Sequence, residues 1–267
     1  MMKCSEIIAG LERLSPISYA CSWDNPGLLA GRTEKEVSKI LIGLDATDEV
    51  VELAVKEKCD FLLTHHPLIF QPIKKINDQD FIGRRLVKLI QADISYYAMH
   101  TNFDCAPGCM ADLVAEVLEL EDTKPLEVMG QEDNGKPYGI GVCGNLKETM
   151  TLKDLVLTVK EKFRLPFVNV YGGEQTERLV SRIAICPGSG KGMSSHALTM
   201  GANILITGDI GHHEGIDAVA QGLTIIDAGH YGLEHIFIDF METYIKENLS
   251  SGLKIIKVPD VFPVIAW

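Results

Sequence analysis

The sequence has no long hydrophobic run, and its beginning is unlike that of an exported protein. No stretch of about 18 consecutive apolar residues occurs, which is the length that a membrane-spanning helix needs. Glu6 and Glu12 lie where a signal peptide would carry its apolar segment. We therefore expect a cytoplasmic protein that is neither exported nor inserted in a membrane.

Paired cysteines are also missing. The seven cysteines are scattered along the chain, and no two of them stand in a Cys-x-x-Cys arrangement. This spacing argues against a zinc knuckle and against a redox-active dithiol. We interpret the cysteines as reduced and mostly buried thiols.

Positive charge is scarce. The chain has 25 Lys and Arg against 37 Asp and Glu, which gives a formal net charge of −12 at pH 7. A protein that mainly binds nucleic acid needs clustered Lys and Arg to neutralise phosphates. Nucleic acid is therefore not expected as a partner, whereas a small anionic substrate at a locally basic or metal-bearing site is compatible with this balance.

What the sequence does contain is the pattern of an α/β protein. Its 267 residues suffice for about two domains, and short β-branched runs alternate with helical patterns. Expected strands cover residues 39–45, 61–64, 95–99, 167–171, 182–186, 203–206, 223–227 and 254–258. Expected helices cover residues 47–58, 81–91, 110–120, 152–163 and 230–248. The polar segment 121–136, with Pro125 and two glycines, predicts a domain boundary.

Three clusters of polar residues follow predicted strands, where open α/β sheets place their functional sites. The first is His65-His66, which could equally be a pair of surface or capping residues. The second contains Asp104, a position equally common for a turn or cap residue. The third pairs His230 with Glu234, four residues apart on one face of a helix start. For this pair the alternative is an ordinary first helical turn.

Taken together, these five residues favour a metal site. Three imidazoles and two carboxylates suit a borderline divalent ion: zinc, iron, manganese, cobalt or nickel. Five protein ligands suit two ions better than one, because a single tetrahedral ion would keep no open position. Two ions could activate water as a nucleophile near neutral pH. The predicted ligands are His65, His66, Asp104, His230 and Glu234.

The motifs around these residues carry a family resemblance. The sequence resembles the NIF-three-like family of dinuclear-metal hexameric proteins, whose members are labelled GTP cyclohydrolase 1 type 2 homologues. The matching motifs occur in the same order along the chain. The resemblance covers nearly the whole chain. It rests on five segments, which are Trp23–Leu29, Thr64–Phe70, His100–Asp104, Thr207–Ile210 with His213, and Gly229–Tyr231 with Glu234.

The resemblance implies a fold, an assembly and roles for residues. It implies two interlocked three-layer α/β domains, the first formed by residues 1–125 plus 228–267 and the second by residues 126–227, without the inserted middle domain of some relatives. It implies a toroidal homohexamer, two metal ions per chain held by the five ligands above, and Glu234 as the bridging ligand. His213 would relay protons or hold substrate, although Gly211 and His212 stand where relatives often have a basic residue and an aromatic one.

The family label implies a metal-dependent hydrolase that opens the imidazole ring of a purine nucleotide, as a GTP cyclohydrolase does. Two alternatives stay open at the level of the sequence. One is a different dinuclear hydrolase that acts on phosphoesters or on amide or peptide bonds, because the same ligands serve all these reactions. The other is a protein without enzymatic activity that stores, delivers or senses metal.

One glycine-rich segment resembles a phosphate-binding motif without matching it. The segment Cys186–Gly192 looks like a phosphate-binding loop, but the pattern needs Gly at position 185 and Ser or Thr at position 192. Ile185 and Gly192 stand there instead, so we interpret the segment as a tight glycine-rich turn.

Overall fold

The computed structural model describes residues 1–267, and the chain divides into two compact units. The first unit comprises Met1–Phe103 and His235–Asp260, and the second comprises Asp104–Glu234 and Val261–Trp267. The division differs from the expected boundaries at 125 and 228. Residues 104–125 belong to the second unit because α5 (Met110–Val117) packs on that unit's strands β8 and β10.

The first unit is built on a five-stranded sheet with the order β13-β4-β5-β6-β2. Its four strands from β13 to β6 are mutually parallel, and β2 pairs antiparallel with β6 at the edge. A separate pair, β1 and β3, is antiparallel. The strands are β1 (Met2–Lys3), β2 (Gly27–Ala30), β3 (Glu36–Val37), β4 (Lys39–Gly43), β5 (Phe61–Thr64), β6 (Ser95–Ala98) and β13 (Lys254–Lys257).

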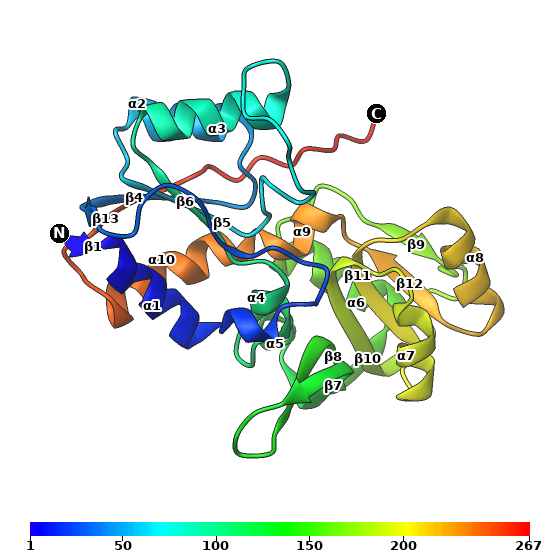
Figure 1. Cartoon of the computed structure of the whole chain (residues 1–267). Helices are drawn as coiled ribbons and strands as arrows, with labels where there is room; N and C mark the ends of the chain where they lie inside the picture. The colour runs from blue at the N-terminus through cyan, green and yellow to red at the C-terminus, as the bar shows by residue number, and fades with distance from the viewer. The chain divides into compact units, whose positions relative to one another are not determined.

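Helices cover both faces of this sheet. α2 and α3 lie on one side, and α1 and α10 on the other (Figure 1). Leu41, Leu62 and Tyr96 share a core with α2 and α3, because side chains of one strand alternate between its two faces. The helices are α1 (Cys4–Leu14), α2 (Asp48–Lys56), α3 (Phe81–Gln91) and α10 (Ile236–Asn248), with a 3-10 turn at Ile17–Tyr19.

The second unit is built on a six-stranded mixed sheet with the order β7-β8-β10-β11-β12-β9. The central strands β10, β11 and β12 are parallel, and β7, β8 and β9 pair antiparallel with their neighbours. The strands are β7 (Leu120–Gln131), β8 (Pro137–Thr151), β9 (Asn169–Tyr171), β10 (Leu179–Ser189), β11 (Ile204–Asp209) and β12 (Thr224–Asp227).

The core of the second unit is made of small and aliphatic side chains. Ala184, Leu205 and Ile225 of the parallel strands pack with Ala197 of α7 and Ala218 of α8. α6 begins at a threonine cap, because the Thr151 hydroxyl accepts a hydrogen bond from the backbone N–H of Asp154. The helices are α5, α6 (Leu152–Lys162), α7 (Met193–Thr199), α8 (His212–Ala220) and α9 (His230–Glu234); the short α4 (Thr101–Cys105) spans the boundary between the units.

Two of the predicted features differ from the structure, and α1, β2, β8, α7 and α8 were not predicted. The segment 121–136 contains no domain boundary: most of it forms β7, which pairs antiparallel with β8 inside the second unit. It is polar because β7 is an exposed edge strand. The expected helix 230–248 is two helices, α9 and α10, which meet at the buried His235.

The α/β fold class itself is confirmed by the alternation of helices and parallel strands in both units. No helix combines the length and the apolar character that crossing a membrane requires.

Candidate metal centre

The first unit presents His65 and His66 at the end of β5. The main-chain carbonyl of His66 accepts hydrogen bonds from the hydroxyls of Thr64 (2.8 Å) and Tyr96 (3.0 Å). The Tyr96 hydroxyl in turn accepts one from the N–H of Leu68 (2.7 Å). These bonds fix the turn after the strand, and the two neighbouring imidazoles lie with ring centroids 4.8 Å apart. Adjacent residues of a regular strand would point to opposite faces.

Hydrogen bonds to Nδ1 set the tautomers of both rings. Nδ1 of His65 lies 2.6 Å from the carbonyl oxygen of Met99, and Nδ1 of His66 lies 2.8 Å from Oδ1 of Asp45. A carbonyl or carboxylate oxygen only accepts, so each Nδ1 carries the proton and each neutral ring keeps its lone pair on Nε2. A second partner that orients the ring in this way is typical of metal-ligating histidines.

A third imidazole, that of His100, completes a cluster in this unit. Its ring centroid lies 5.5 Å from that of His65 and 5.7 Å from that of His66. Its Nδ1 lies 2.8 Å from Oδ1 of Asp24, whose side chain is fully buried. Burial raises the pKa of Asp24, but hydrogen bonds from His100 and Thr101 outweigh it and hold the pKa at about 2. Asp24 is therefore an anion that orients this ring.

The second unit contributes His230 and Glu234 from α9. Nε2 of His230 lies 3.3 Å from Oε2 of Glu234, as the spacing of four residues predicted. Nδ1 of His230 lies 2.6 Å from Oδ2 of Asp209, the last residue of β11. The side chain of Glu234 is only 2 % exposed. The carboxylate and the imidazole are thus held side by side, with Asp209 behind the ring.

Asp104 lies in α4, the short helix that follows β6, and its Oδ1 atom is buried. Burial first, and then the negative charges of Asp104 and Glu234, raise the pKa of the buried Cys186 thiol.

Glycines make room for these groups. A Cβ on Gly188 would lie 2.6 Å from Oε1 of Glu234 and 3.5 Å from Nε2 of His230, and its backbone is left-handed with φ +72°. A Cβ on Gly208 would lie 2.8 Å from Cα of His230. The glycine-rich segment that imitates a phosphate loop thus forms a wall of the candidate metal centre.

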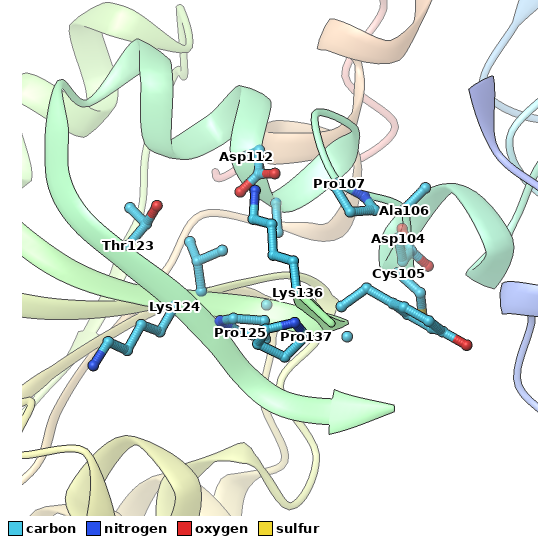
Figure 2. Close-up of a pocket in the computed structure, with 15 residues that line it drawn as sticks. Asp104, Cys105, Ala106, Pro107, Asp112, Thr123, Lys124, Pro125, Lys136 and Pro137 are labelled. Carbon is cyan, nitrogen blue, oxygen red and sulfur yellow. The ribbon is translucent and has the colours of Figure 1, made fainter. Parts of the chain in front are cut away.

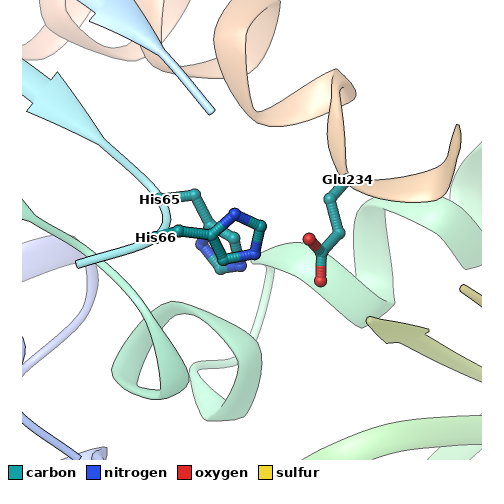
Figure 3. A group of neighbouring side chains, drawn as sticks. All are labelled: His65, His66 and Glu234. Atoms are coloured by element: carbon teal, nitrogen blue, oxygen red, sulfur yellow. The ribbon is translucent and has the colours of Figure 1, made fainter. Parts of the chain in front are cut away.

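The residues fit a metal ion. His65, His66 and Glu234 each offer one ligand atom, and these atoms lie within 4.8 Å of one another (Figure 3). Two imidazoles and one carboxylate suit zinc and other borderline divalent ions. This group could hold a metal ion.

Asp104 also lines a small cavity in the second unit. The cavity measures about 60 Å³ and is bordered by Lys124 and Lys136 of the β7–β8 hairpin and by Asp112 of α5 (Figure 2). Two carboxylates, Asp104 and Asp112, balance the two lysines of this recess, and Figure 2 shows the Lys136 side chain reaching toward Asp112.

The remaining predicted residue, His213, lies exposed in the first turn of α8, with its ring centroid 5.3 Å from that of His212. Its catalytic role stays a prediction. Sequence reasoning gave no role to the three carboxylates behind the imidazoles, Asp24, Asp45 and Asp209. The only signal was their place in motifs or at strand ends, which a turn residue shares.

The sequence is similar to a known protein family and to curated proteins. The sequence profile of the Duf34/NIF3 (NGG1p interacting factor 3) family matches residues 2–260. A curated relative from Clostridium perfringens, named GTP cyclohydrolase 1 type 2 homolog, is 33% identical over 255 residues, which are 96% of this chain and 95% of the relative.

The fold is also similar to that of solved structures. A hypothetical protein of Staphylococcus aureus has a TM-score of 0.87 at 29% identity, with 99% of both chains covered. A Bacillus cereus protein related to NIF3 has a TM-score of 0.89 at 24% identity, with 100% of this chain and 99% of that chain covered, and shows the shared fold. These findings define an α/β protein with a candidate metal centre. The chain belongs to the Duf34/NIF3 family.

Proposed function

We propose that this protein binds two divalent metal ions per chain and uses them in a hydrolysis of the GTP cyclohydrolase 1 type 2 kind, the activity in its curated relatives' names. The proposed ligands are His65, His66, Asp104, His230 and Glu234. The observation that carries the proposal is the donor set: each of the three imidazoles donates from Nδ1 to an oxygen, and so keeps Nε2 for a ligand.

Each residue has a distinct task in this proposal. Bound ions would act as Lewis acids and supply a hydroxide nucleophile near neutral pH. Met99, Asp45 and Asp209 hold the three imidazoles in the ligating tautomer. The buried Glu234 is the proposed bridging ligand, and His213 is the proposed proton relay.

The proposed substrate is a purine nucleotide. The nucleotide is suggested by the name that the curated relatives carry. In the reaction, water adds at C8 of the imidazole ring and a C8–N bond breaks. GTP would yield a formamide, or a dihydroneopterin-type product after further steps.

The test is turnover of GTP by the metal-loaded protein, with chromatographic detection of the formamide or dihydroneopterin-type product. Glu234→Gln should reduce the rate at least 100-fold, since it removes the bridging charge. Glu247→Gln, on the exposed part of α10, is the matched control and should leave the rate unchanged. No turnover across a panel of purine nucleotides by protein that has bound its metal would rule the activity out.

We also propose that six chains form a ring, as the family resemblance implies. Light scattering should then give a mass near six times the chain mass of 29.4 kDa. A mass near 29.4 kDa would contradict the ring.

A further inference from the structure

The second unit contains a larger cavity whose purpose the proposed metal site does not explain. It measures about 330 Å³, within the range of small-molecule pockets, which begins at about 300 Å³. His230, one of the proposed metal ligands, lines it. Its wall also includes Phe167, Asn169, Asp227, Tyr231 and Phe262.

Aromatic rings form part of the wall. Tyr231 of α9 meets Phe262 edge to face, with ring centroids 5.2 Å apart and an interplanar angle of 73°. The Tyr231 hydroxyl accepts a hydrogen bond from the N–H of Val261 (3.2 Å), which ties the C-terminal segment to α9. Phe167 adds a third, half-buried ring. Aromatic faces of this kind stack on planar heterocycles.

A carboxylate supplies the polar part of the wall. Asp227 at the end of β12 stands opposite Asn169 of β9 in the strand register. Oδ1 of Asp227 accepts the N–H of Gly229 at 3.0 Å, and its carboxylate also accepts from the Asn169 side chain. An ionised carboxylate has about four acceptor positions, so these two donors leave capacity for two more.

We propose that this cavity binds the heterocyclic ring of the substrate, and that Asp227 selects a guanine-type ring by accepting from its ring N–H and its adjacent exocyclic amino group. This inference rests on the proposed function and specifies how its substrate is recognised. Adenine presents an acceptor beside its amino group, so a carboxylate would repel that edge, and hypoxanthine lacks the amino group. Because His230 lines the same cavity, a bound ring lies beside the proposed metal centre.

The simpler explanation is that Asp227 only stabilises the turn into α9 through its bond to Gly229. The two explanations differ in specificity. A turn-stabilising residue affects all ligands alike, whereas a base-reading carboxylate affects guanine far more than adenine.

The experiment is calorimetric binding of guanosine, inosine and adenosine, which carry no phosphate and so isolate recognition of the base. Wild type should bind guanosine at least tenfold more tightly than inosine and adenosine. Asp227→Asn should weaken guanosine binding about 10- to 100-fold and remove the preference over adenosine, because an amide can donate to the acceptor of adenine. Asp217→Asn on the exposed face of α8 makes the same charge change outside the cavity and should bind as wild type.

A second variant keeps the test decisive if Asp227→Asn does not fold. Phe167→Ala should weaken all three nucleosides by about tenfold and leave their ranking intact, because stacking does not distinguish the bases. Equal binding of the three nucleosides by wild type, no guanosine binding at all, or an unchanged preference in Asp227→Asn would overturn the inference.

Metal content and GTP turnover of the same preparations separate this inference from the proposed function. Guanosine selectivity without metal or turnover contradicts only the proposed function. Turnover of GTP with no effect of Asp227→Asn on selectivity contradicts only the role given to Asp227.

Discussion

At the scale of single residues, each imidazole among the proposed metal ligands has a hydrogen-bond acceptor at its Nδ1 atom. Met99 O, Asp45 and Asp209 accept from Nδ1 of His65, His66 and His230. Two of these acceptors are carboxylates, which make the imidazole a stronger donor to a metal than a neutral acceptor does.

Replacing one of these carboxylates should weaken metal binding without loss of a ligand. In Asp209→Asn the amide can donate to Nδ1 of His230, which moves the ring proton to Nε2. We expect metal affinity to fall about 10- to 100-fold, measured by competition with a chromophoric chelator. Asp217→Asn, exposed on α8, changes the net charge equally and should keep wild-type affinity. Equal affinity of the two variants would mean that Asp209 does not orient the ring.

Gly188 offers a second test with a close internal control. Gly188→Ala and Gly192→Ala both place a side chain on a left-handed backbone, at φ +72° and +80°. Gly192→Ala should cost about 1 kcal/mol of unfolding free energy, and Gly188→Ala more, because its Cβ would also lie 2.6 Å from Oε1 of Glu234. Only the Cβ at position 188 approaches Glu234, since a Cβ on Gly192 meets nothing within 4 Å. Metal content should therefore fall in Gly188→Ala alone. An equal metal content in both variants would contradict the conclusion that Gly188 leaves the space that Glu234 needs to bind metal.

At the scale of elements, Asp24 connects the loop before β2 with the start of α4. Its carboxylate accepts from the backbone N–H and the hydroxyl of Thr101 and from His100. Because its pKa in the folded protein, about 2, lies below the usual 3.8, the ionised form stabilises the fold. That contribution is complete above about pH 4 and is lost as the pH falls towards 2.

Asp24→Asn should therefore lower the unfolding free energy at pH 7 by about 1–2 kcal/mol. The difference from wild type should shrink as the pH falls below 4, when Asp24 becomes protonated in the unfolded chain. Urea denaturation of both proteins at pH 7, 4 and 3 measures this difference in unfolding free energy. Asp78→Asn, at an exposed carboxyl, should show no such trend. A difference that is constant with pH would show that the charge of Asp24 contributes nothing.

The elements that sequence reasoning predicted well carry a strong pattern of apolar residues. The strand predicted at 39–45 was recognisable as a short continuous apolar run, and the helix 81–91 by apolar residues at helical spacing. β7 was missed because an exposed edge strand carries polar residues and lacks that alternation. The break at His235 was missed because the apolar spacing continues through it.

The candidate site could be predicted as a set of residue types but not as a geometry. The double histidine and the His230–Glu234 spacing were visible in the sequence. The role of Asp209 depends on β11 and α9 meeting in space, and the need for Gly188 depends on its approach to Glu234. Such contacts between distant segments leave no periodic signal.

At the scale of the whole molecule, two α/β units each carry part of the proposed ligand set. His65 and His66 belong to the first unit, and Asp104, His230 and Glu234 belong to the second. A metal ion that binds the folded chain but not the unfolded chain stabilises the folded state by mass action. Removal of metal by a chelator should therefore lower the thermal midpoint, and metal should restore it.

We propose that each chain holds two divalent ions, and elemental analysis counts them. Wild type and His65→Ala are purified without chelator and without a nickel column, and metal is measured per chain. We expect about two ions per chain in wild type and fewer in His65→Ala. Metal-free wild-type protein that also fails to take up zinc, iron or manganese would contradict it.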